Sequence, residues 1–211
     1  MKKQLRWLLI AFLLTCSIIA LWWFGTRMQR QLRFSNTHVE IVENDIDIVL
    51  GSDSARITVY MFASYTCHHC HEFLLVDLPR LQQRYIDSGQ VKFVVKPINI
   101  AENRDMMSAL QLAGCMNNDG NADDIRELLL TDPTAVYSDE FRQLIDDILD
   151  SNSELAECLV ANDFSSVKQN NKLFSAIGLK VTPIFVIGSH LYKGRRSYDK
   201  FCEIIDYELN K

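Results

Sequence analysis

The chain has 211 residues, of which 48% are hydrophobic and 23% are charged. These values are close to the average for globular proteins and allow one domain with a full-sized core, but not two large domains. The formal net charge of −5 is unevenly spread, because the first 33 residues hold six of the 22 basic residues and no acidic one. The rest carries 16 basic and 27 acidic residues, and such an acidic body argues against nucleic acid as a partner.

Near the N-terminus, residues 7–24 form a run without a charged side chain. As a helix this run would span about 27 Å, close to the thickness of a bilayer core. All three tryptophans (Trp7, Trp22 and Trp23) lie at its ends, where interfacial rings prefer to sit. A cleaved signal peptide is the alternative, but its apolar region is normally shorter and ends in small residues. We expect an uncleaved transmembrane anchor over residues 1–25, with Cys16 inside it, and a polar stalk over residues 26–42.

Strands are predicted over residues 45–50, 57–63 and 91–95 from their alternating or β-branched apolar character. Helical spacing covers residues 68–85, where Pro79 predicts a kink. Further helices are predicted near 103–117, 122–130, 138–150, 153–161 and 166–177, with Ser138, Ser153 and Ser165 as N-caps and Gly178 as a stop. A hairpin over 184–193 with its turn at Gly188-Ser189 and a last helix from Tyr198 complete the order β-β-α-β, helical insert, β-β-α.

The sequence Cys67-His68-His69-Cys70 stands at the predicted start of a helix. There the first sulfur meets unpaired backbone N–H groups and the positive end of the helix dipole, which both favour a thiolate. His68 and His69 can add charge or hydrogen bonds, so we expect the pKa of Cys67 to fall below the ordinary value of about 8.5. Only the reduced state holds this thiolate, so its stabilisation makes the disulfide more oxidising. Cys67 is the expected attacked sulfur, and Cys70 is its buried partner.

Two other interpretations of this pair are a zinc site and a structural disulfide. Zinc normally takes four ligands, whereas Cys67, Cys70 and one histidine supply three. A disulfide closed over so short a ring beside a helix start is reactive rather than a strong covalent link.

Thr182-Pro183 precedes the apolar run Ile-Phe-Val-Ile. A cis-proline in this place would direct the Thr182 backbone at the cysteine pair, where it could bind an extended substrate strand.

These segments together resemble the thioredoxin-fold disulfide oxidoreductases of the DsbA family. The resemblance rests on residues 62–73 around the cysteine pair, the kinked helix through Leu78-Pro79, the strand at 91–94 and residues 177–185. It implies an α/β fold in which a thioredoxin-like mixed sheet, residues 43–98 and 181–211, carries an inserted all-helical subdomain, residues 99–180. One transmembrane helix would precede it.

The same resemblance implies an oxidase that donates its Cys67–Cys70 disulfide to reduced extracytoplasmic proteins, with no cofactor besides that disulfide. A membrane quinone-linked partner would reoxidise it. We expect a monomer held in the inner membrane by a single span with its catalytic domain in the periplasm, or a periplasmic protein if the signal is cleaved.

Three positions depart from the family pattern. His68 stands where proline is common, and Met61 occupies the position of a buried carboxylate, so proton transfer at Cys70 must use water or another group. Val181 stands where a small residue is common in the substrate groove. The resemblance also favours a bridge between Cys115 and Cys158, although two separate buried thiols are the simpler interpretation; Cys202 is expected to be a core thiol.

Three rival functions remain open at this point. A reductase or isomerase would use the same residues. A metal carrier would use Cys67 and Cys70 with His69 or His71. A thioredoxin-like domain retained for protein interaction is the third, which the intact cysteine pair disfavours.

Overall fold

The computed structural model describes Thr15, Ser17, Ile19 and residues 40–118, 122–161, 163–178 and 180–211. The chain divides into two compact units, Met1–Asn36 and Thr37–Lys211, and the elements described below lie in the second. The predicted anchor, Cys16 included, lies outside the described residues except at three positions. Among the residues that the structure does describe, no helix is both long and apolar enough to cross a membrane.

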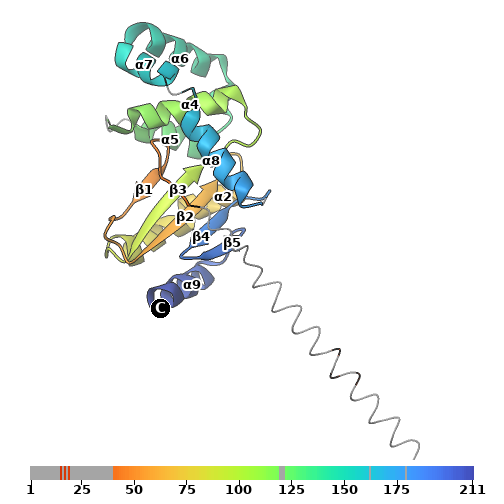
Figure 1. The fold of residues 1–211 in the computed structure, drawn as a ribbon. Helices are drawn as coiled ribbons and strands as arrows, with labels where there is room; N and C mark the ends of the chain where they lie inside the picture. Colours follow the sequence, from red (N-terminus) through yellow and green to blue (C-terminus); the bar gives the residue numbers. More distant parts are fainter. Residues whose placement is uncertain are drawn as a thin grey trace, which may run out of the picture. The chain divides into compact units, whose positions relative to one another are not determined.

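A five-stranded mixed sheet forms the centre of the second unit (Figure 1). Its strands are β1 (Ile48–Leu50), β2 (Ile57–Ala63), β3 (Val91–Pro97), β4 (Ile184–Ile187) and β5 (His190–Lys193). They lie in the order β1-β3-β2-β4-β5, with β2 and β3 parallel and the other neighbours antiparallel. The hairpin of β4 and β5 turns at Gly188, whose φ of +58° suits glycine, as predicted.

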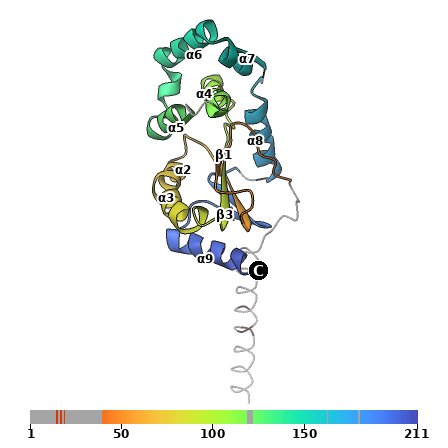
Figure 2. The same cartoon turned by 90° about the vertical axis from the view of Figure 1, so that its left-hand side faces the viewer.

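Helices cover both faces of this sheet and form a separate layer beyond one end of it (Figures 1 and 2). On one face lie α2 (His68–Glu72), α3 (Leu78–Leu81) and the C-terminal α9 (Tyr198–Leu209). On the other face lies α8 (Ser165–Ala176), packed on β3. The layer beyond the sheet holds α4 (Arg104–Cys115), α5 (Ala122–Thr131), α6 (Asp139–Ser151) and α7 (Ser153–Ala161), with short 3₁₀ turns at Met116–Asn118 and Ala135–Tyr137.

The element order is therefore the predicted one, and a thioredoxin-like sheet interrupted by helices is present. The core on the α2 side is rich in aromatic rings, with Phe73 at 4.7 Å from Phe185 and 5.1 Å from Phe201 between ring centroids. This cluster fixes the helical run after Cys70 on the sheet, because Phe73, Phe185 and Phe201 are all almost fully buried.

Pro79 interrupts the helix after the cysteine pair, as predicted. The interruption takes the form of π-helical turns on either side of the proline. The π-helical turns η1 (Phe73–Asp77) and η2 (Gln82–Ile86) flank α3, and Pro79 stands in the first turn of α3. The N–H of Leu78 donates to the carbonyl of Phe73, five residues back. Wider turns of this kind accommodate a residue that has no N–H of its own.

Two of the three predicted N-caps are wrong. Ser138 caps α6 by accepting a hydrogen bond from the Phe141 N–H at 3.1 Å. Ser153 is instead the first residue of α7, and Asn152 accepts from the Leu155 N–H at 3.0 Å. Ser165 is likewise the first residue of α8, preceded by Phe164 in the left-handed region. Gly178, with a φ of +73°, lies just after the end of α8, as predicted.

The first strand is shorter than predicted, because Asp47 turns inward before β1 begins. Its carboxylate pairs with Lys96 on β3, and both side chains have no exposed area. The Asn44 N–H and the Asn170 side chain each donate to Asp47 at 2.9 Å. Burial raises the pKa of Asp47, and the charge and hydrogen bond of Lys96 oppose that rise. This buried pair joins the segment before β1, the sheet and α8.

Cys115 and Cys158 form a disulfide, with Cα atoms 5.9 Å apart. It joins the end of α4 to α7 within the helical layer. In the chain-entropy description a loop of this length stabilises the fold by about 4 kcal/mol. Cys202 is a buried free thiol on α9, as predicted.

Candidate active site

The cysteine pair lies where β2 ends and the first helix begins. The Cys67 N–H donates to the Ser64 carbonyl at 3.0 Å, which closes the turn between strand and helix. Cys67 then occupies the N-cap of α2, and its carbonyl accepts from the Cys70 N–H at 2.9 Å and the His71 N–H at 3.1 Å. Cys67 is half-buried whereas Cys70 is completely buried, so the first sulfur is the one that a substrate can approach.

Thr182 and Pro183 lie against this pair. Phe62 on β2 pairs with Ile184 on β4, so Pro183 stands beside the turn that leads to Cys67. The Thr182–Pro183 peptide bond is cis, and the Thr182 carbonyl oxygen lies 3.5 Å from Cys67 Sγ. Residues more than a hundred positions apart in the sequence are thereby brought together, in the arrangement predicted from the two motifs.

Cys67 has a pKa below its ordinary value. Burial is the largest single influence and would raise it, but hydrogen bonds from the Thr182 side chain, the Cys70 thiol and the N–H groups of Cys70 and His69 outweigh that effect. The Thr182 carbonyl acts in the opposite sense, because it accepts a hydrogen bond only from the protonated thiol. Donors to the ionised sulfur therefore dominate, and the thiolate is favoured.

Cys70 differs sharply from its neighbour. Burial, followed by the hydrogen bond with Cys67, raises the pKa of Cys70 to about 12. A sulfur with so high a pKa is a poor leaving group unless a proton reaches it as the disulfide opens. Met61, which is fully buried in the core of the same sheet face, has no acidic proton to supply.

The histidines contribute less to the thiolate than expected. His68 and His69 are both exposed, and the contribution of His69 to the pKa of Cys67 comes through its backbone N–H. The His69 ring instead lies 3.3 Å from Glu72. The His71 ring hydrogen-bonds the Tyr65 carbonyl. In the part of the chain that the structure describes, no three His, Cys, Asp or Glu side chains come together as metal ligands would.

An ion-pair chain beside the cysteines was not foreseen from the sequence. Arg195, just after β5, lies 2.8 Å from Asp77 and 3.3 Å from Glu72. The sequence signal for such a partner is an acid, Asp77, inside an otherwise apolar helical stretch.

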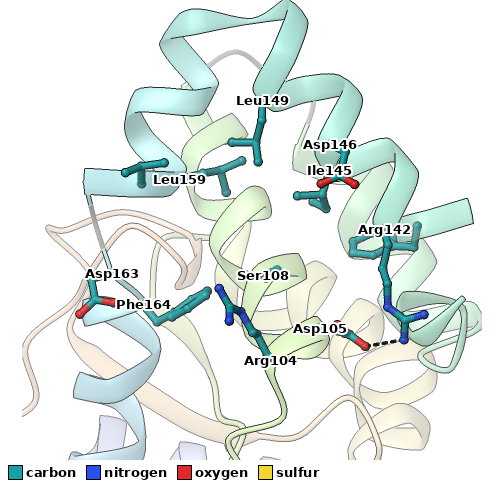
Figure 3. A pocket seen from close by; sticks show the side chains of 12 residues that line it. Arg104, Asp105, Ser108, Arg142, Ile145, Asp146, Leu149, Leu159, Asp163 and Phe164 are labelled. Carbon is teal, nitrogen blue, oxygen red and sulfur yellow. Dashed lines mark hydrogen bonds and ion pairs between the residues drawn. The ribbon is translucent and has the colours of Figure 1, made fainter. Parts of the chain in front are cut away.

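A cavity of about 500 Å³ opens in the helical layer, and none of its lining residues belongs to α2 or to the Thr182–Pro183 loop (Figure 3). Its walls come from α4, α6, α7 and the residues before α8, with apolar side chains such as Ile145, Leu149 and Leu159 facing Arg104 across it. Arg142 is paired with Asp105 at 3.0 Å on its rim. Neither a cysteine nor a histidine lines the cavity, so the redox chemistry is assigned to the Cys67 site.

Comparison with known proteins agrees with this geometry. The sequence model of the family described as Thioredoxin matches residues 43–207. The chain belongs to the thioredoxin family. A putative protein-disulfide oxidoreductase of Rickettsia conorii is 27% identical to the chain over 194 residues, which cover 89% of this chain and 69% of that protein. Disulfide bond formation protein D of Bacillus subtilis is 27% identical over 169 residues, 76% of each chain.

Solved structures of DsbA-type proteins share the same thioredoxin fold with its helices. Wolbachia pipientis α-DsbA1 superposes with a TM-score of 0.64 at 19% identity, covering 83% of this chain and 96% of its own. Oxidised BdbD from Bacillus subtilis gives a TM-score of 0.59 at 20% identity, covering 79% and 94%. At such identities the likeness establishes the fold, and the chemistry is argued from the residues above.

Proposed function

We propose that this chain is an oxidase that donates a Cys67–Cys70 disulfide to reduced proteins outside the cytoplasm. The chain is a DsbA-like thiol–disulfide oxidoreductase, as its relatives named protein-disulfide oxidoreductase and disulfide bond formation protein D indicate. The observation that carries the proposal is the contrast between an accessible sulfur of lowered pKa and a buried sulfur of raised pKa, both beside the Thr182–Pro183 loop.

The reaction exchanges one disulfide for another. A substrate thiolate attacks Cys67 Sγ, the Cys67–Cys70 bond breaks, and Cys70 takes up a proton from water as it leaves. A second substrate thiolate then attacks the substrate sulfur of the mixed disulfide and releases Cys67 as a thiolate. The substrate loses two electrons, the enzyme gains them, and the hydrogen-bond donors around Cys67 favour this direction by stabilising the released thiolate.

Turnover requires that another disulfide or oxidant restore the Cys67–Cys70 bond. We propose a membrane quinone-linked reoxidase for this step and a monomeric enzyme held at the inner membrane by residues 1–25, facing the periplasm. We propose that the rest of the chain consists of a stalk over 26–42, a thioredoxin-like domain over 43–98 and 181–211, and a helical subdomain over 99–180. Support for the anchor comes from the uncharged run and its flanking tryptophans.

The test follows oxidation of a reduced, unfolded ribonuclease by the oxidised protein, with two matched variants. Mixed in the reduced form with disulfide-bonded ribonuclease, Cys70→Ser should accumulate a mixed disulfide, because the Cys67 thiolate attacks a substrate disulfide and no second enzyme sulfur then releases the substrate. Cys67→Ser should accumulate none, because the remaining sulfur is buried. Oxidation by the wild-type chain no faster than background would reject the proposal.

Equilibration with glutathione separates an oxidase from a reductase or isomerase that uses the same residues. A potential clearly above that of thioredoxin, about −270 mV, supports the oxidase. A potential near that value would favour the reductase direction instead.

A further inference from the structure

Asp77 on η1 is a buried carboxylate, only 2% exposed. A buried charge is costly unless a cation and hydrogen bonds satisfy it. Arg195 meets this need, because its Nε donates to Asp77 Oδ2 at 2.8 Å. The pair spans 118 positions of sequence, so it joins the helical run that carries the cysteines to the segment that follows β5.

The same guanidinium reaches the cysteine pair through a second carboxylate. Arg195 Nη1 lies 3.3 Å from Glu72 Oε2, and that same oxygen lies 3.3 Å from Nδ1 of His69, which stands between the two cysteines. A planar guanidinium can bind two carboxylates at once, whereas a lysine would act as a single point charge.

The residue before Arg195 is bonded to the proline loop. The Gly194 N–H donates to the Pro183 carbonyl at 2.8 Å, and Gly194 has a φ of +72°, in the region that glycine adopts without strain. Gly194 and Arg195 therefore hold both the loop that faces Cys67 and the helical run that carries it.

Charge gives Arg195 a second role. Glu72 places a carboxylate beside the C-x-x-C turn, Asp77 adds a second on the same helical run, and negative charge near a thiol disfavours its ionisation. The hydrogen bond with Asp77 and the charges of both carboxylates raise the pKa of Arg195, so its cation persists wherever the enzyme is folded. Hydrogen bonding to His69, with a smaller effect of the Arg195 charge, lowers the pKa of Glu72.

We propose that Arg195 is a positioning residue of the redox centre, which fixes the cysteine helix against the Thr182–Pro183 loop and offsets the charge of Glu72 and Asp77. In this role it favours the reduced state that holds the Cys67 thiolate. The inference rests on the proposed function, since it assigns a purpose to the ion pairs only if Cys67 exchanges disulfides.

The experiment uses the full chain and measures two quantities in each variant: the pKa of Cys67 from thiolate absorbance, and the equilibrium constant with glutathione. Arg195→Gln should raise the pKa of Cys67 by roughly half to one unit, since it leaves the negative charges of Glu72 and Asp77 without their cation. The protein should become about three- to tenfold less oxidising, and tenfold corresponds to about 30 mV.

Shifts of the Cys67 pKa in opposite directions distinguish this role from a general loss of structure. Glu72→Gln keeps the Asp77 pair and removes one negative charge, so it should lower the pKa of Cys67 and make the disulfide more oxidising. The double variant should return toward the wild type. Arg195→Lys keeps the charge but loses the guanidinium that contacts both carboxylates, so its two measured values should lie between those of Arg195→Gln and the wild type. Arg196→Gln is the matched control, because that exposed arginine lies over the Tyr192 ring, at 5.9 Å from its centroid.

A purely structural Arg195 would lower the free energy of unfolding of the oxidised and reduced forms equally, and both measured quantities would stay at their wild-type values. That result, or shifts of the same sign in Arg195→Gln and Glu72→Gln, would overturn the inference. If Arg195→Gln does not fold, Glu72→Gln and Arg195→Lys decide the matter alone. Failure of the wild type to oxidise ribonuclease would instead reject the proposed function, and the pKa comparison would still be measured.

Discussion

At the scale of single residues, the two sulfurs of the pair have opposite acid–base properties although only two residues separate them. Position on the first helical turn explains the difference. Cys67 at the N-cap meets donors from Thr182, Cys70 and His69, whereas Cys70 one turn later is enclosed by the apolar core. One sulfur is thereby ionised easily and the other resists ionisation, which is the division of labour that directional disulfide exchange requires.

Thr182→Val tests the contribution of the threonine side chain to this difference. The valine keeps the shape and the backbone carbonyl but removes the hydroxyl donor, so the pKa of Cys67 should rise by about one unit, the value of one hydrogen bond to a charged group. Thiolate absorbance measured against pH gives the shift. Thr66→Val is the control, because the Thr66 hydroxyl bonds Ser64 at 2.9 Å instead of the sulfur. An unchanged pKa in Thr182→Val would contradict the assignment.

The lowered pKa of Cys67 also predicts how stability depends on pH. A group whose pKa is lower in the folded state than in the unfolded state stabilises the fold above its unfolded pKa, about 8.5 for cysteine, and that stabilisation is lost as pH falls through the folded value. Cys70 acts in the opposite sense, because its pKa is raised to about 12 in the folded state and its thiol ionises near pH 8.5 only in the unfolded chain, so its effect begins only at the upper end of this window. The free energy of unfolding of the reduced protein should therefore rise with pH up to about 8.5.

Urea titrations of the reduced and oxidised protein between about pH 5 and 8.5 measure this effect. The oxidised protein is the control, since its sulfurs do not titrate and all its other groups are shared. Parallel pH profiles for the two forms would show that Cys67 has an ordinary pKa in the folded state.

At the scale of elements, much of the site could be predicted because its signals are local. A strand entering Cys67, a helix leaving it and Pro183 before Ile184 each depend on a few adjacent residues. The π-turns around Pro79 and the caps at Asn152 and Phe164 were missed, since they depend on how the backbone adapts to packing. Sequence spacing fixes a helix to within a few residues, and its end is then decided by tertiary contacts.

Pairs between distant elements were the hardest to foresee, and the buried Lys96–Asp47 pair shows why. Each residue looks like an ordinary polar position of a strand edge, yet both have no exposed area. Lys96→Met should lower the free energy of unfolding by about 3–5 kcal/mol, because it leaves the Asp47 carboxylate buried without its cation. Asp47→Asn combined with Lys96→Met should recover most of that loss.

Urea denaturation of the two variants gives these free energies. Lys92→Met serves as the control, since Lys92 lies on the same strand and pairs with Glu43 and Asp53 nearer to solvent. Equal decreases in the free energy of unfolding of Lys96→Met and Lys92→Met would contradict the prediction that breaking the fully buried pair costs more.

At the scale of the whole molecule, the site and its supporting contacts are confined to the second unit. The sulfurs, the Thr182–Pro183 loop, the Arg195 pairs and the Cys115–Cys158 bridge all lie within Thr37–Lys211. Strand order and helix order followed from the sequence, because each element carries its own periodicity. The Cys115–Cys158 disulfide could be proposed only with the help of a family resemblance, since spacing alone does not choose among six cysteines.

This confinement predicts that residues 37–211 alone keep the redox activity. The truncated chain should oxidise ribonuclease at the rate of the full chain and show the same Cys67 pKa, because the contacts described for the site join residues of Thr37–Lys211 to one another. It should differ in location: the full chain should stay with membranes through alkaline carbonate washing, as the proposed anchor requires, and the truncated chain should be released. N-terminal sequencing of the cellular protein separates an anchor from a cleaved signal, since a retained Met1 excludes cleavage. Release of an uncleaved full chain by carbonate would reject the anchor and leave the chemistry of Cys67 untouched.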